Sequence, residues 1–136
     1  MNKKAIVFTK PYTAEYIDEE LRDISDDEVL VKMEYTAVSG GTERACIVGS
    51  KNTNGDFPRR LGYCGVGYIE ELGSYPHHWT HHDDCRAILD LISARKIKVK
   101  PIISRVVLPE EAPKIYEELC YDKNFPLGTI FDWRSI

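Results

Sequence analysis

The chain has 136 residues, of which 43% are hydrophobic and 29% are charged. These proportions fit one soluble globular domain with its own core and exclude a disordered or fibrous chain. The formal net charge of −4 gives no sign of the basic surface that nucleic-acid binding requires. No apolar run is long enough to span a membrane, and the apolar run of the opening segment is too short for a signal peptide. We therefore expect a cytoplasmic protein that binds neither nucleic acid nor membrane.

Cysteine spacing favours the same compartment. The cysteines are far apart and form no C-x-x-C pair: Cys46, Cys64, Cys85 and Cys120. Without a secretory signal, isolated cysteines of this kind are typical of reduced thiols in the cytoplasm.

The first half of the chain predicts strands separated by turns. Short apolar or alternating runs favour strands over residues 4–8, 16–19, 28–38 and 63–72. In the third of these strands, Val29, Val31, Met33 and Tyr35 would share one face because side chains alternate along a strand. Residues 49–60 are rich in glycine, asparagine and proline, which predicts an exposed loop.

A turn and a short helix are expected in the middle of this half. The adjacent residues Gly40 and Gly41 favour a turn, and a helix is predicted over 42–48. Glu43 and Arg44 would lie in its first turn. We expect these two side chains to be solvated or to form surface ion pairs.

The second half alternates helix and strand. A polar connector over 74–82 holds all four histidines, and a helix is expected over 81–93. A strand is predicted over 102–107, a second helix over 109–120 and a last strand over 129–133. Because regular β-α-β alternation is absent from the first half, the order of elements predicts an α+β fold rather than a doubly wound sheet.

The glycine run after residue 61 does not match a dinucleotide-binding loop. That loop has the order G-x-G-x-x-G between a strand and a helix. Gly62, Gly65 and Gly67 have the order G-x-x-G-x-G and lie before or within a predicted strand. Glycines that bend a curved sheet are the favoured interpretation.

Several motifs, in a shared order, resemble those of the zinc-type medium-chain alcohol dehydrogenases. The spacing of Gly62, Gly67 and Gly73 is similar to the family's glycine signature, and Gly40-Gly41-Thr42-Glu43 resembles its C-G-[S/T]-D turn. The other similar segments are 4–7, 28–32, 96–104, 108–113 with Tyr116, and 128–130. The resemblance covers nearly the whole chain except the histidine segment. It implies a partial GroES-like β-barrel, α+β in class, with two helices in the C-terminal half.

The resemblance also implies that a large middle part of the family's chain is missing. Residues 1–73 resemble the family's N-terminal block, 74–82 connect, and 83–136 resemble its C-terminal block. The rest of the catalytic barrel and the Rossmann domain have no counterpart. We therefore treat 1–136 as a single truncated catalytic domain that holds no NAD(P) cofactor.

The family's catalytic zinc ligands are replaced in this chain. The first cysteine falls at Gly40, the histidine at Tyr63 and the neighbouring glutamate at Cys64. Glycine offers no ligand and tyrosine is a rare one, so no metal is expected there. Thr42 matches the family's proton-relay threonine and is the one candidate catalytic residue. Without zinc or nicotinamide it has no proton to relay, and a turn or helix-cap threonine is the alternative.

The histidine cluster is a second candidate site. His77 and His81, and likewise His78 and His82, are four residues apart, and each pair on a helix could bind one metal ion. A proline and a cap residue place the helix start after His78, which favours a polar connector instead.

Two classes of function remain open. The resemblance implies the catalytic domain of an NAD(P)-dependent oxidoreductase, inactive alone or supplied with a cofactor domain in trans. The alternative is a non-catalytic binding or assembly module. Because the family barrel closes with strands that this chain lacks, we expect an unpaired sheet edge that a homodimer or another subunit would cover.

Overall fold

The computed structural model describes residues 2–53, 56–62, 64–74, 92–96 and 98–136. Its strands are β1 (Asn2–Lys10), β2 (Thr13–Glu20), β3 (Val29–Ala37), β4 (Gly65–Leu72), β5 (Arg105–Val107) and β6 (Thr129–Asp132). The helices among the described residues are α1 (Thr42–Ile47) and α3 (Ala112–Tyr121), and the short 3-10 helices are η1 (Lys100–Ile102) and η2 (Pro109–Glu111). The combination of sheets and helices confirms the α+β class.

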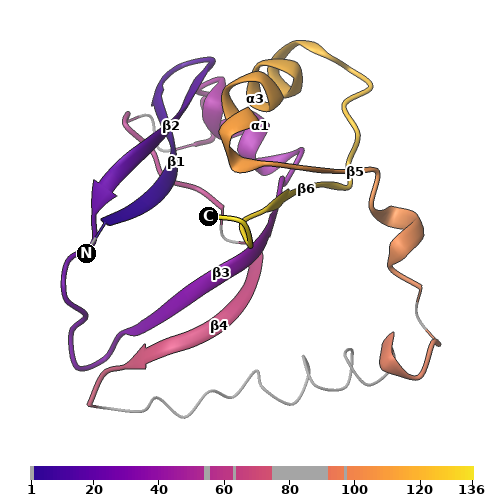
Figure 1. Cartoon of the computed structure of the whole chain (residues 1–136). Helices are drawn as coiled ribbons and strands as arrows, with labels where there is room; N and C mark the ends of the chain where they lie inside the picture. Colours follow the sequence, from indigo (N-terminus) through magenta and orange to yellow (C-terminus); the bar gives the residue numbers. More distant parts are fainter. Residues whose placement is uncertain (1, 54–55, 63, 75–91, 97) are drawn as a thin grey trace.

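The described strands form two separate sheets (Figure 1). β1 and β2 make an antiparallel hairpin. The larger sheet has the order β4-β3-β6-β5, in which β3 is antiparallel to β4 and β6, and β5 is parallel to β6. A parallel pair needs a crossover connection, and the segment that contains α3 supplies it. The described strands do not close into a barrel, so β4 is an edge strand.

The core lies where α3 meets both sheets. Ile115, Tyr116 and Leu119 are buried and recur at helical spacing along one face of α3. They belong to one cluster with Phe8 of β1 and Phe131 of β6, and the Phe8 and Tyr116 rings meet edge to face at 4.7 Å. Burying each large apolar side chain contributes about 1.5–3 kcal/mol. The helix therefore holds the two sheets together.

α1 packs beside α3, and the β3–β4 ribbon reaches away from both helices (Figure 1). The Arg44 guanidinium donates to the carbonyl oxygen of Cys120 at 3.1 Å, which joins the two helices. Ile47, near the end of α1, is fully buried. None of the described helices is both long and apolar enough to span a membrane.

The structure confirms the strands predicted for the first half, the short helix after Gly41, the helix after Leu108 and the last strand. Two expectations lie mostly outside the described residues. These are the connector over 74–82, of which only Ser74 is described, and the helix predicted over 81–93, of which only the last two residues are described.

One predicted element is wrong in part. The strand predicted over 102–107 is shorter, because its start belongs to η1 and only β5 is extended. Pro101 favours the tight turn of η1. The carbonyl oxygen of Gly128 then accepts the backbone N–H groups of Ser104 at 2.9 Å and Arg105 at 3.3 Å. These bonds hold the chain in a loop before β5 begins.

Candidate functional site

A groove of about 760 Å³ lies between the β1–β2 hairpin and β3. Its apolar lining comes from both sheets and from the segment before β4: Ile6, Phe8, Val31, Met33, Leu61 and Trp133. Its rim is charged on both sides and includes Lys4, Asp18, Glu19, Lys32, Arg60 and Glu70. A concave apolar surface with a polar rim is the usual character of a binding site.

The end of β6 fixes one wall of the groove. The Trp133 indole N–H donates to Thr36 Oγ1 at 2.9 Å, and the Trp133 backbone N–H donates to the Glu34 carbonyl at 2.8 Å. The Tyr16 ring of β2 lies 6.1 Å from the Trp133 ring. Trp133 therefore contacts both sheets and sets their separation.

The edge of β1 that faces the groove is open. At one end of this edge, Phe8 exchanges two backbone hydrogen bonds with Arg59, each 2.8 Å long. These bonds show that the backbone groups of Phe8 point away from β2, toward the outer edge. Because backbone groups of alternate strand residues point the same way, those of Asn2, Lys4 and Ile6 point to this edge as well. In the described part of the chain these groups have no backbone partner. All three residues line the groove, so the groove exposes a row of unpaired donors and acceptors.

The charges on the rim are paired with one another. Lys4 Nζ lies 2.6 Å from Asp18 Oδ1, and Glu19 pairs with both Arg60 and Lys3. The Arg60 guanidinium, more than Lys3, lowers the pKa of Glu19. Such exposed pairs contribute little to stability. Because each positive charge lies beside a negative one, the rim is close to neutral. It therefore creates no electrostatic field of one sign that would attract a small charged ligand.

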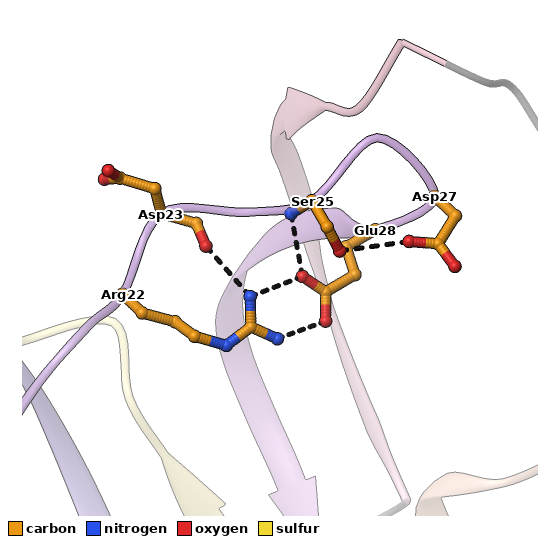
Figure 2. A network of polar contacts seen from close by, with 5 residues as sticks. All are labelled: Arg22, Asp23, Ser25, Asp27 and Glu28. Carbon is orange, nitrogen blue, oxygen red and sulfur yellow. Dashed lines mark hydrogen bonds and ion pairs between the residues drawn. The ribbon is translucent and has the colours of Figure 1, made fainter.

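A second hollow, of about 710 Å³, lies beside the loop from β2 to β3. Figure 2 shows its polar network: the Arg22 guanidinium donates to both carboxylate oxygens of Glu28, and the Ser25 backbone N–H donates to Glu28 Oε2 at 2.9 Å. These donors, of which Arg22 has the largest effect, lower the pKa of Glu28 to about 2. The network closes the loop on itself and positions the start of β3, so its role is structural.

A buried acid lies outside the groove, between α1 and α3. Glu43 is fully buried, and its Oε2 accepts a hydrogen bond from the Tyr116 hydroxyl at 2.6 Å. Its Oε1 has no hydrogen-bond partner in the described part. Burial raises the pKa of Glu43, and burial with the neighbouring carboxylate raises the pKa of Tyr116. The expectation that Glu43 is solvated or in a surface ion pair is therefore wrong.

The sequence missed this pair because its members are 73 residues apart. One signal was present: Glu43 lies four residues before the apolar Ile47, and so on the same helix face. The charge of the Glu43 carboxylate favours an exposed side chain, but the packing of α1 on α3 places that helix face inward. Arg44, its neighbour, is partly buried and donates to a backbone carbonyl rather than to a carboxylate.

The candidate catalytic residue Thr42 is exposed and does not line the groove. Gly41, not Thr42, is the N-cap of α1, and no side chain caps this helix. Gly40 lies before it, with the Leu127 side chain 3.3 Å from where a Cβ would lie. Cys64 is exposed, and Tyr63 is outside the described residues. Of the positions that the structure describes, Gly40, Thr42 and Cys64 all lie outside the lining of the groove.

The other candidate ligands are distributed as follows. His77, His78, His81 and His82 are outside the described residues. Within the described part, no group of three or more histidine, cysteine, aspartate or glutamate side chains is arranged to hold a metal ion. Cys46, Cys64 and Cys120 are free thiols, and Cys85 is not among the described residues. Burial raises the pKa of the Cys120 thiol, which makes it a core side chain rather than a nucleophile.

Comparisons with protein-family models, with curated proteins and with solved structures give no match to this chain. The resemblance to the medium-chain dehydrogenases therefore rests on the motifs of the sequence.

Proposed function

We propose that this chain is a non-catalytic binding module, derived from the catalytic domain of a medium-chain dehydrogenase, whose groove binds an extended polypeptide segment. One observation carries the proposal: the groove combines an apolar lining with the open edge of β1. An added strand would pair with the backbone groups of Asn2, Lys4 and Ile6 and bury alternate apolar side chains against Ile6 and Met33. A small rigid ligand would satisfy few of those backbone groups.

The sequence supports the loss of catalysis. The resemblance places Gly40 and Cys64 where the family holds zinc, and it provides no counterpart of the nicotinamide-binding domain. Thr42, the relay position of the family, is exposed on α1 and lies outside the groove. The groove would thus keep part of the shape of the family's barrel but serve for association.

A titration with the apolar fluorescent dye anilinonaphthalene sulfonate, at sub-micromolar protein, tests the binding surface. We expect saturable binding that Val31→Lys weakens by about tenfold, because a charge then enters the apolar lining. The matched control is Val106→Lys, since Val106 is an exposed valine on β5 that does not line the groove. Equal effects of the two variants, or no saturable binding, would contradict the proposal.

Hydride transfer is measured separately. We expect no turnover of small alcohols or carbonyl compounds with NAD(P) or NAD(P)H, and no binding of either cofactor tighter than millimolar. Turnover that Thr42→Ala abolishes would show that the chain is an enzyme and would overturn this part of the proposal.

A further inference from the structure

We infer that the segment that fills the groove is β4 of a second copy, exchanged reciprocally, so that β1 of each protomer pairs with β4 of the other. This inference rests on the proposed function and names its partner. It uses two features of the same chain that one symmetric contact would satisfy together: two open strand edges, and opposite charges along them.

The first feature is the pair of open edges. β4 is the outer strand of the larger sheet, next to β3 alone. Within the described residues, its outer backbone groups have no partner between Gly65 and Leu72. β1 is similarly open along Asn2, Lys4 and Ile6. The two strands have nine and eight residues, so their lengths match. Open edges of this length are templates for pairing with another chain.

The side chains of β4 are unusual for an edge strand. Val66, Tyr68, Ile69 and Leu72 are each between 60% and 66% exposed. Two cross-strand pairs, Val29 with Leu72 and Val31 with Ile69, extend this apolar surface onto β3. Val29 and Val31, two of the four residues expected to share a face of this strand, are both largely exposed because no described element covers the ribbon. A surface of this composition marks an interaction site.

Charge selects the pairing. β1 carries Lys3 and Lys4, whereas β4 carries Glu70 and Glu71. In an antiparallel pair of two β1 strands or of two β4 strands at full overlap, the lysines or the glutamates lie opposite uncharged residues, so neither pairing gains electrostatic attraction. Pairing β1 with β4 brings opposite charges together. Lys3 and Lys4 already pair with β2, and Glu70 lies 3.9 Å from Lys32 of β3. Each of these pairs has at least one solvent-exposed partner and is weak, so they do not prevent this.

Symmetry then closes the assembly. A two-fold axis that places β4 of one protomer against β1 of its partner places the partner's β4 against the first β1 as well. Both of these open edges are covered at once. The outer edge of β2 stays unpaired in this arrangement, and α3 packs against that strand. A single one-way contact would instead propagate into a chain of molecules.

Charge reversal with mixing tests the inference. The experiment uses light scattering over a concentration series of the full chain and of two variants, Lys3→Glu/Lys4→Glu and Glu70→Lys/Glu71→Lys. The wild type should become dimeric. Each variant alone should dimerise about tenfold or more weakly, since both of its contacts then bring like charges together. The two variants mixed should form a heterodimer of wild-type strength, because both contacts again join opposite charges.

The controls and contrary results are equally specific. Asp122→Lys/Lys123→Glu, a swap just after α3, should leave dimerisation unchanged, and thermal unfolding of each variant alone checks its fold. A wild type that stays monomeric at high concentration overturns the inference. So do variants that fail to recover on mixing. A monomer whose dye binding still depends on Val31 leaves the proposed function standing, whereas a monomer with no such binding overturns both.

Discussion

The buried pair of Glu43 and Tyr116 gives a prediction whose size follows from the structure. Tyr116→Phe removes the hydroxyl that donates to Glu43 Oε2 at 2.6 Å and keeps the ring that packs on Phe8. Hydrogen bonds to charged groups contribute about 1.5–3 kcal/mol to stability. The variant should therefore lose about that much free energy of unfolding, which lowers the Tm by roughly 3–5 °C per kcal/mol for a domain of this size.

The pH dependence of stability identifies the cause. Burial raises the pKa of Glu43 in the folded chain above its ordinary value of 4.5. Between these two pKa values the folded state binds more protons than the unfolded state. The free energy of unfolding therefore decreases as the pH rises through this window, and the contribution of Glu43 is complete below pH 4.5. Tyr116→Phe removes a bond that favours the carboxylate, so it should extend the window to higher pH.

Urea unfolding followed by far-ultraviolet circular dichroism, from about pH 4 to about pH 8, measures both effects. Glu43→Gln has no carboxyl to titrate, so it should gain stability relative to the wild type as the pH rises. Glu117→Gln, at an exposed position of α3 next to Tyr116, is the matched control and should follow the wild type. Parallel curves for Glu43→Gln and the wild type would refute the reasoning, as would a Tyr116→Phe variant of unchanged stability.

Two further predictions concern the β3–β4 ribbon and the loop before it. Gly67→Ala should lower the free energy of unfolding by more than about 1 kcal/mol, because its Cβ would overlap the Lys32 carbonyl oxygen, whereas Gly41→Ala, with open space around it, should change it by less than about 0.5 kcal/mol. Thermal melts compare the two, and equal losses would show that the ribbon accommodates the methyl group. Glu28→Gln should remove a stabilisation that is present above pH 4.5 and is lost as the pH falls toward about 2, since the pKa of Glu28 is lowered when the chain folds. Acid titration of both proteins checks this, and identical acid midpoints would contradict it.

Local sequence patterns determined most of the secondary structure. The alternating run from Val29 to Tyr35 specifies a strand, and the apolar stripe through Ile115 and Leu119 specifies a helix, because side chains a few residues apart share a face. The α+β class follows from the order of these elements. The strand predicted over 102–107 failed at its start, since hydrogen bonds donated to the distant carbonyl oxygen of Gly128 decide the path of the backbone there.

Only the tertiary structure decided which of these faces are buried. β6 pairs between β3 and β5, and that arrangement brings Trp133 to the groove and Tyr116 to Glu43. No local pattern specifies which residues meet in either contact, because its members are many residues apart and meet only when both sheets pack on α3. The same packing buries a charged side chain that composition assigns to the surface and leaves apolar residues of β3 and β4 exposed. Burial depends on which elements surround a residue, and periodicity along the chain specifies only which residues share a face.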